Sequence, residues 1–408
     1  MPARQPSAPW IDLLLVVGLA LVLRLLFCVA VYPHVADRFA AGDGYDVIAL
    51  NVVHGKGYVL DGLPAAAARL PVYPLLLALG FAAFGGVSWP WQLGQCICGA
   101  ATCAVVLTMA RRYASRAAAL VASGFCAIHP TLILYAARPF TETVYIFLLV
   151  LLVRVLSAAP ERVAAGGALL GLQLLTKSTA GLHVVAFLPA LARRQWSALL
   201  RAGVVMLALL APWLAWNLWT SGAPNLFSAT GGIALYHGIY ISRHVAWTRP
   251  AGDFNRDAEI ELWHDLEGRG VPRSADIVQR NRVAGQLARA WVTQHAGEAL
   301  RLWARNLVLT WYLGRDRLSM LVHAILHCCL LAAAAVGAPR LWRWRPESHA
   351  MVSIAVLLIA AYTVFHAAVQ PAVRYILPAV PLAALLAAGV FVGPMPPPDT
   401  GDRAARGK

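Results

Sequence analysis

The stretch Trp10–Val31, WIDLLLVVGLALVLRLLFCVAV, decides the fold class of this chain. Only Asp12 and Arg24 are charged in this otherwise apolar run. A transmembrane helix needs about 20 consecutive, mostly apolar residues, so the stretch is long enough to cross a bilayer. Because no small-x-small cleavage site follows it, the sequence favours an uncleaved first membrane helix over a signal peptide.

The composition of the whole chain points the same way. The 408 residues are 60% apolar and 13% charged, whereas a soluble domain is about 45–50% apolar and about 25% charged. The mean hydropathy is +0.64. These values exclude a soluble enzyme, a soluble DNA-binding protein and a disordered chain. All seven cysteines lie inside apolar runs, which indicates small buried side chains rather than disulfides or zinc ligands.

The apolar runs predict an all-α polytopic membrane protein with about ten transmembrane helices. Two of the runs are short and are interpreted as a broken helical pair, 163–177 and 179–192. A further run, 71–86, is interpreted as an interfacial helix of the first external loop. The ten runs are 10–31, 90–110, 117–135, 139–157, 163–177, 179–192, 199–219, 319–337, 350–368 and 374–393.

The distribution of basic residues predicts which side of the membrane each loop faces. With 71–86 at the interface, the short loops on the side of the two termini hold fifteen lysines and arginines, and the opposite loops hold six. Cytoplasmic loops carry an excess of basic residues, so both termini are predicted to be cytoplasmic. Most of the +15 net charge is then a cytoplasmic collar, and no nucleic-acid partner is expected.

Four parts follow from this topology. An N-terminal membrane core, 1–219, includes the catalytic external loop 32–86. An external segment, 220–318, contains a helix-like pattern from Asp276 to Trp311. C-terminal transmembrane helices occupy 319–394, and a cytoplasmic tail occupies 395–408.

Acidic residues are rare, which makes their positions informative. Asp37, Asp43, Asp46 and Asp61 lie in the first external loop, and Glu142 stands at the outer end of a membrane helix. An ionisable group at such a depth is expensive unless it faces a polar cavity or a partner. Lys177 at the broken pair and Arg374 at the outer end of the last helix are the basic counterparts, and these charges could converge on one outward-facing cavity.

The first external loop also carries an ordered series of short motifs. It reads Gly42-Asp43-Gly44-Tyr45-Asp46, then Gly55-Lys56-Gly57-Tyr58, then Arg69-Leu70-Pro71-Val72-Tyr73-Pro74. This order resembles the family 39 glycosyltransferases, membrane enzymes of the glycosyltransferase C superfamily that are related to protein O-mannosyltransferases and to the aminoarabinose transferase of lipid A. Further matches, spread over roughly 40–390, are His129-Pro130, Thr141-Glu142 with Tyr145, Gly171-Leu172 with Thr176-Lys177, Arg282 to Trp311, and Arg374-Tyr375 with Pro378 and Pro381.

The resemblance implies a glycosyltransferase that takes a hexose or pentose from a polyprenyl-phosphate donor. It implies an inverting reaction on the external, periplasmic side of a bacterial inner membrane. The partners are then the lipid-linked donor, the bilayer and an acceptor that is a protein, a lipid or a polysaccharide. No cofactor follows from the residues, but some relatives bind a divalent metal near the loop carboxylate, so a metal stays open.

By the same resemblance Asp43 is the general base. An acceptor hydroxyl is a poor nucleophile until a carboxylate takes its proton. The family's acid commonly lies about four residues before the tyrosine, whereas Asp43 lies two before Tyr45, so Asp46 and Asp37 stay as alternatives. Glu142 orients the acceptor or a metal, or forms a simple ion pair with Arg138.

A second group of residues is expected to bind substrate. Lys177 and Arg374 are candidates for the donor phosphate, although basic residues near helix ends also snorkel to the interface. Arg69 binds phosphate or else meets lipid headgroups at the start of the interfacial helix. The full set of substrate-binding candidates is Tyr45, Arg69, Tyr73, Arg138, Lys177, His237, Arg374 and Tyr375.

Three further interpretations complete the sequence reading. His323 and His327 share one helix face and are interpreted as buried hydrogen-bonding groups, because two ligands do not make a metal site. The same topology and charges also suit a transporter of lipids or lipid-linked sugars, although no inverted repeat is visible. The irregular spacing of Asp43 keeps a catalytically inactive family member as a third hypothesis.

Overall fold

The computed structural model describes residues 9–36, 43–60, 63–65, 68–158, 162–221, 228, 230–245, 254–272 and 275–393. These residues are almost entirely helical, and the one pair of strands among them forms a small antiparallel hairpin. Asp37 and Asp61 lie outside the described residues.

The first half of the chain alternates long and short helices. Helix α1 continues through a π-helical turn, η1, into α2, and a 3-10 segment, η4, follows α9. The elements are α1 (Pro9–Leu26), η1 (Phe27–Val31), α2 (Tyr32–Val35), α3 (Tyr45–Val53), β1 (Val59–Leu60), β2 (Leu63–Pro64), α4 (Val72–Phe84), α5 (Trp89–Ala110), α6 (Arg116–Ile128), α7 (Pro130–Ala137), α8 (Glu142–Ala158), α9 (Val163–Leu174), η4 (Ser178–Phe187), α10 (Leu188–Ala192) and α11 (Trp196–Ser221).

The second half begins with four polar helices and returns to the bundle. Its elements are α12 (Gly231–His244), α13 (Phe254–Glu267), α14 (Ile277–Gln294), α15 (Ala296–Leu309), α16 (Arg317–Trp344), η5 (Pro346–Ser348), α17 (His349–Val369), α18 (Val373–Ile376), α19 (Ala379–Ala387) and η6 (Ala388–Phe391).

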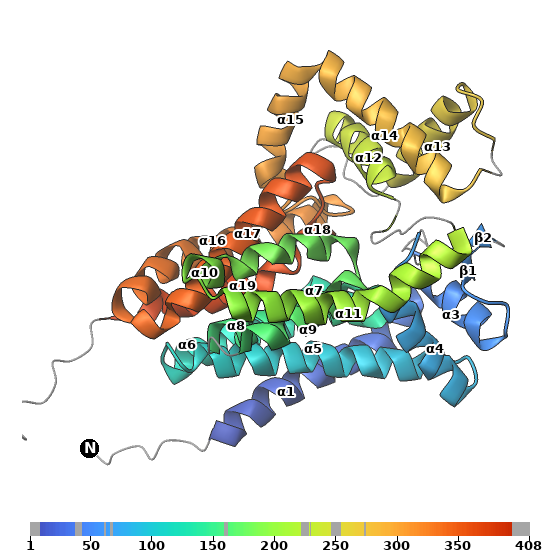
Figure 1. Cartoon of the computed structure of the whole chain (residues 1–408). Coiled ribbons are helices and arrows are strands. Elements are labelled where there is room, and N and C mark those ends of the chain that lie inside the picture. Colours follow the sequence, from blue (N-terminus) through green and yellow to red (C-terminus); the bar gives the residue numbers. More distant parts are fainter. Residues whose placement is uncertain are drawn as a thin grey trace, which may run out of the picture.

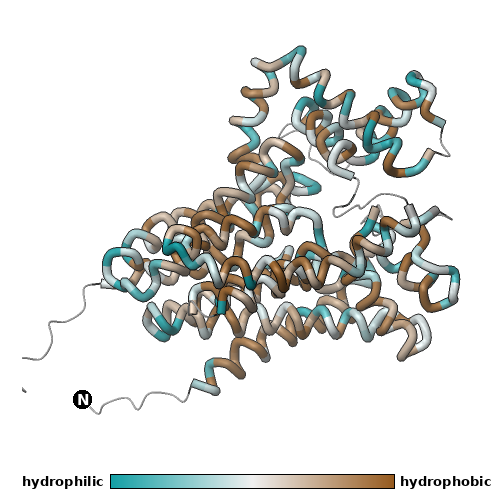
Figure 2. Tube along the Cα trace, viewed as in Figure 1, coloured by the Kyte–Doolittle hydropathy of each residue, from teal (hydrophilic) through white to brown (hydrophobic). Residues whose placement is uncertain are grey.

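The helices form two groups that differ in polarity. Figure 1 shows the long helices α1, α5, α11, α16 and α17 in one elongated bundle, with α12–α15 gathered at one end of it. The same end carries α3 and the β1–β2 hairpin. Figure 2 shows that the bundle is mostly hydrophobic, whereas α13 and α14 carry many hydrophilic residues. The arrangement agrees with a membrane core and an aqueous segment at one end.

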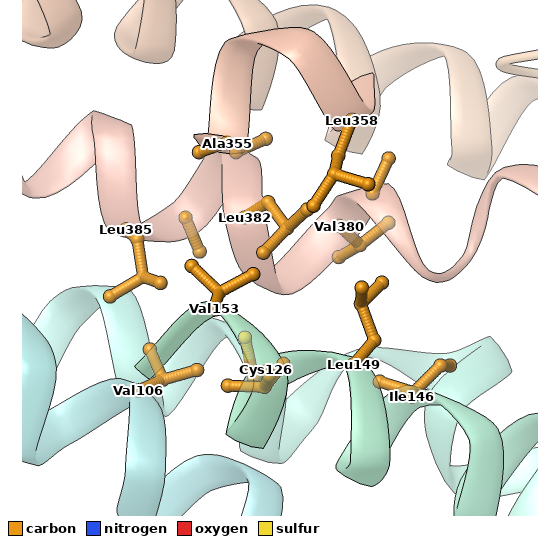
Figure 3. Packing of buried hydrophobic residues seen from close by; sticks show 14 of the residues in the cluster. Val106, Cys126, Ile146, Leu149, Val153, Ala355, Leu358, Val380, Leu382 and Leu385 are labelled. Carbon is orange, nitrogen blue, oxygen red and sulfur yellow. The ribbon is translucent and has the colours of Figure 1, made fainter. Parts of the chain in front are cut away.

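A single large apolar cluster holds the bundle together. It joins α5, α6 and α8 to α17 and α19, although these elements are far apart in sequence (Figure 3). Small residues let the helices approach: a Cβ on Gly167 of α9 would lie 2.1 Å from the carbonyl oxygen of Ala202 in α11. The labelled core residues are Val106, Cys126, Ile146, Leu149, Val153, Ala355, Leu358, Val380, Leu382 and Leu385.

Both charged side chains of the first helix are buried and hydrogen-bonded. Arg24 donates to the carbonyl oxygens of Ala127, at 3.2 Å, and Cys126, at 3.3 Å, which fixes α1 against the end of α6. Asp12 accepts two bonds from Arg116, at 2.7 and 2.8 Å, near the start of α6. No partner for Arg24 could be predicted from the sequence, because the backbone carbonyls at a helix end leave no signal in the pattern of side chains.

Five described helices are long and apolar enough to cross a membrane, and α6 with α7 makes a sixth if the bent pair is one span. The pair bends by 47° at His129, because the residue before Pro130 is held away from the helical conformation. The expected break near Lys177 is present, with α9 ending at Leu174 and η4 beginning at Ser178. The single helix-like pattern 276–311 forms two helices, α14 and α15, which meet at His295.

Candidate active site

An arginine from the last part of the chain joins two carboxylates from the first half. Arg374 Nη2 lies 2.6 Å from Asp43 Oδ2, and Arg374 Nε lies 2.5 Å from Glu142 Oε1. The Glu142 side chain is 0% exposed, whereas those of Arg374 and Asp43 are 23% and 33% exposed. Side-chain exposure therefore increases from Glu142, at the buried start of α8, through Arg374 to Asp43, which is the most exposed of the three.

Lys177 is the second cation of this cluster. Its Nζ lies 2.9 Å from Glu142 Oε1, and it lies 5.7 Å from the centre of the Tyr145 ring and 5.6 Å from that of Tyr375. Glu142 thus receives two charge-assisted hydrogen bonds, which offset the cost of burying its charge. We call Asp43, Glu142, Lys177 and Arg374 the charged cluster.

Local backbone features place these side chains. Asp43 precedes Gly44, whose φ of 77° is left-handed and begins α3. Arg69 Nε donates to the carbonyl oxygen of Asp43 at 2.7 Å and so fixes that backbone. Glu142 lies in the first turn of α8, where free N–H groups and the helix dipole favour a negative charge.

Arg374 reaches the cluster because α17 stops early. Pro371 keeps Gln370 out of the helical conformation, and Gln370 has φ −158° and ψ 102°. The chain restarts as α18, where the backbone N–H of Val373 donates to the carbonyl oxygen of Leu313 at 3.1 Å. This contact fixes the turn that carries Arg374.

Aromatic rings form one wall of the cluster. The guanidinium carbons of Arg138 and Arg374 each lie 4.3 Å from the centre of the Phe140 ring, and Arg374 also lies over Tyr135 and Tyr375. Cation–π contacts of this kind favour a fixed guanidinium. Glu142 therefore pairs with Arg374 and Lys177, while its sequence neighbour Arg138 packs against Phe140.

The electrostatics keep Asp43 ionised. Burial alone raises the pKa of the Asp43 carboxyl, but the charge and hydrogen bond of Arg374, with the charge of Arg69, outweigh burial and hold this pKa below 3.8. Burial raises the pKa of the Tyr45 hydroxyl beside it. In the absence of other ligands, Asp43 is a paired carboxylate whose proton affinity is low.

The other predicted residues of the first loop surround the cluster. The Tyr45 and Tyr73 rings meet edge to face with centres 5.2 Å apart, and the Arg69 guanidinium lies over Tyr45 at 5.4 Å. Tyr73 Oη donates to Gln95 Oε1 at 3.2 Å. Asp46 lies in the first turn of α3, and no cation among the described residues forms an ion pair with it.

The predicted histidines lie elsewhere. His237 Nε2 lies 3.2 Å from Glu259 in the α12–α13 region, where Arg280 also binds Glu259 at 2.9 Å. His327 and His323 are buried and hydrogen-bonded, as expected. His327 Nδ1 meets the Trp311 carbonyl at 2.5 Å, and His323 Nδ1 meets the Ser319 carbonyl at 2.6 Å.

Among the described residues, the donor set of the charged cluster does not match a divalent-metal site. Within the described part of the chain, no group of three histidine, cysteine, aspartate or glutamate side chains is placed to hold a metal ion. The two carboxylates of the charged cluster are instead bridged by Arg374. A guanidinium between Asp43 and Glu142 already supplies the positive charge that a cation would bring.

Sequence reasoning missed a polar group beneath the cluster. Gln173, His183 and Tyr362 are buried and hydrogen-bonded to one another or to Tyr145. His366 stacks on Tyr375 with ring centres 5.0 Å apart. The available signal was the presence of polar side chains within otherwise apolar runs, which is costly unless they are satisfied.

The fold and its contacts define a helical membrane protein with a charged cluster at one end of its bundle. Residues 66–216 match the model of the dolichyl-phosphate-mannose-protein mannosyltransferase family. This match confirms, over those residues, the resemblance expected from the sequence. It includes Arg69, Glu142 and Lys177, whereas Asp43 and Arg374 lie outside it.

Two solved structures align with most of the chain, and both are of ArnT from Cupriavidus metallidurans. The structure bound to undecaprenyl phosphate is 17% identical, with a TM-score of 0.45 over 94% of this chain and 78% of that one. The apo structure is 18% identical, with a TM-score of 0.42 over 93% and 77%. No match was found among curated protein sequences.

Proposed function

We propose that this protein is an integral membrane glycosyltransferase that moves a sugar from a polyprenyl-phosphate donor to an acceptor on the external side of the membrane. The observation that carries the proposal is the bridge from Asp43 through Arg374 to Glu142. It brings a carboxylate for proton transfer and cations for a phosphate to one end of an apolar bundle. The family match over residues 66–216 supports the same class of reaction.

The proposed reaction is a single displacement. The acceptor hydroxyl gives its proton to Asp43 while its oxygen attacks the anomeric carbon of the donor sugar. The bond from that carbon to the phosphate oxygen breaks on the opposite face, and its electron pair leaves with the polyprenyl monophosphate. Attack from the opposite face inverts the anomeric centre.

Charge balance at the site suits an anionic leaving group. Arg69, Lys177 and Arg374 are three cations against the two carboxylates Asp43 and Glu142. A donor phosphate supplies the missing negative charge and competes with Asp43 for Arg374. When Arg374 turns to the phosphate, Asp43 loses its strongest partner and its proton affinity rises, as a general base requires.

The remaining predicted residues are proposed to shape the substrate site. Tyr45 and Tyr73 pack beside Asp43, and Tyr375 lies under both cations of the cluster. Arg138 shares the Phe140 ring with Arg374. Asp46 stays an alternative base, and His237 is proposed to bind acceptor from the external segment rather than donor.

The proposed placement is a bacterial inner membrane, with the site facing the periplasm. We propose about ten crossings, both termini in the cytoplasm and the domain organisation 1–219, 220–318, 319–394 and 395–408. The five long apolar helices, the bent pair α6–α7 and the shorter apolar helices support this topology. The gathering of α3, the hairpin and α12–α15 at one end supports a single external side.

Release of polyprenyl monophosphate from a panel of polyprenyl-phosphate hexoses and pentoses tests the function. The purified protein in lipid is supplied with crude envelope acceptors, and the wild type is compared with Asp43→Asn. Release that requires Asp43 supports the proposal and identifies the sugar. If release survives Asp43→Asn but is lost in Asp46→Asn or Asp37→Asn, the general base is Asp46 or Asp37 instead.

If polyprenyl monophosphate is released from none of the donors, the proposed glycosyltransferase activity is contradicted. In that case, movement of a lipid-linked sugar across sealed vesicles indicates the transporter. Absence of both activities indicates an inactive family member.

A further inference from the structure

A buried group of four polar side chains lies beneath the charged cluster and joins four helical elements. Tyr145 comes from α8, Gln173 from α9, His183 from η4 and Tyr362 from α17. Each is at most 1% exposed. His183 is the centre of the group, because its two ring nitrogens reach all three of the others.

The hydrogen bonds fix the state of the His183 ring. Gln173 Nε2 donates to the carbonyl oxygen of Leu148 at 3.0 Å, so Gln173 Oε1 is the acceptor that faces His183 Nδ1. The proton of the neutral imidazole is therefore on Nδ1. Nε2 is left as an acceptor with one lone pair, and the hydroxyls of Tyr362, at 2.6 Å, and Tyr145, at 3.0 Å, both lie within its reach. The Tyr362 hydroxyl also donates to Tyr145 Oη at 2.8 Å, so one hydroxyl at a time donates to Nε2.

His183 lies within an unusual stretch of backbone. The segment η4 is a 3-10 helix of ten residues, whereas 3-10 runs longer than three or four residues are uncommon because their hydrogen bonds are poorly aligned. Lys177 stands immediately before η4 with an extended backbone, φ −155° and ψ 130°. Bonds from outside the segment help to hold it, and His183 supplies those to α8, α9 and α17.

The same group shapes the surface on which Lys177 rests. The Tyr145 ring stacks on His183 with centres 5.1 Å apart. On the other side, Tyr362 is followed by His366 at 5.9 Å, and His366 by Tyr375 at 5.0 Å. The Lys177 ammonium lies over the first and the last of these rings, Tyr145 and Tyr375.

We propose that His183 is a positioning residue for Lys177: it holds η4 and the stacked rings so that the Lys177 ammonium stands beside Glu142, ready for the donor phosphate. Its effect on position rests on the structure alone, and its effect on donor binding also rests on the proposed function. Thr179 completes the connection, because its hydroxyl lies 3.2 Å from Tyr145 Oη, two residues after Lys177.

The position of Lys177 can be measured without any substrate. The chain has three lysines, Lys56, Lys177 and Lys408, so protein labelled with 13C at the lysine ε-carbon gives few signals. Lys177→Met identifies the Lys177 signal by its loss. We expect His183→Phe, which keeps a ring but loses the hydrogen bonds, to move that signal and leave those of the other two lysines in place.

His327→Phe is the matched control. His327 is also buried and hydrogen-bonded through both ring nitrogens, but no described contact joins it to Lys177. The control is expected to leave the Lys177 signal unchanged. If His183→Phe does not fold, Tyr362→Phe removes a single hydroxyl from the same group and is expected to move the signal less. An unchanged signal in a folded His183→Phe or Tyr362→Phe protein overturns the proposal.

The link to substrate is tested by a double-mutant cycle on the binding of polyprenyl monophosphate. We expect His183→Phe to weaken binding about tenfold when Lys177 is present, a typical coupling between residues linked through one network. In a Lys177→Met background the same substitution should change binding less than about twofold. Equal losses in both backgrounds refute the role in binding.

A wild type that binds no lipid monophosphate contradicts the proposed function instead. The NMR result for Lys177 then decides whether the positioning role holds.

Discussion

Replacing Arg374 by methionine gives the sharpest test of the charged cluster, because it removes one cation from two carboxylates at once. Losing one partner of a buried ion pair costs about 3–5 kcal/mol, and a hydrogen bond to a charged group contributes about 1.5–3 kcal/mol. Glu142 keeps its bond from Lys177, and Asp43 is 33% exposed. These features reduce the cost, so we expect Arg374→Met to lower the free energy of unfolding by about 2–4 kcal/mol.

Unfolding in mixed micelles with increasing SDS, followed by tryptophan fluorescence, measures this loss. The mechanism also predicts a rescue. Glu142→Gln should destabilise the wild type but restore part of the stability of the Arg374→Met protein, because it neutralises a carboxylate that has lost its strongest partner. An Arg374→Met protein within about 0.5 kcal/mol of the wild type, the range of neutral surface changes, would refute the reasoning. A Glu142→Gln effect of equal size and sign in both backgrounds would do the same.

Three further outcomes are expected. The pKa of Asp43 is lowered in the folded protein, so the stability that this carboxylate contributes is complete above the ordinary pKa of 3.8 and is lost as the pH falls through the lower folded pKa. Because Arg374→Met removes the cation that lowers this pKa, acid unfolding of that variant should begin at a higher pH. Gly238→Ala should loosen the external segment and speed its proteolysis, because the new Cβ would lie 1.7 Å from the Val369 carbonyl oxygen, whereas Gly231→Ala on the same helix meets nothing within 4 Å. Donor cleavage should persist in a chelator such as EDTA. Activity that EDTA abolishes and Mg²⁺ or Mn²⁺ restores would contradict a site that works without a metal.

The sequence predicted the members of the charged cluster better than their pairing. Glu142, Lys177 and Arg374 were visible because a charge beside apolar runs is expensive and therefore rare. The partner of Glu142 was not visible. Arg138 stands four residues before Glu142, but its extended backbone and the tight turn that follows place it over Phe140, and Arg374 arrives from 232 residues further on.

The breaks within helices were only partly predictable. Pro130 breaks the α6–α7 pair at the preceding residue, as the restriction on residues before proline requires. Pro212 and Pro339, however, lie inside the continuous helices α11 and α16. The difference depends on packing around each helix, which is a property of the folded bundle. The 3-10 form of η4 likewise depends on the bonds of His183 to α8, α9 and α17.

The long sequence separation within the Arg374 bridge has a consequence for biosynthesis. At about 5–20 residues per second, a ribosome needs roughly 12–46 s to add the 232 residues that separate Glu142 from Arg374. In the proposed topology, α8 enters the membrane with its carboxylate during that interval. Lys177, which follows Glu142 by only 35 residues, reaches the membrane early enough to neutralise it. Under the proposed function, Lys177 is therefore an early counter-ion for Glu142 in the nascent chain, and the site is complete only when Arg374 arrives with the last helices.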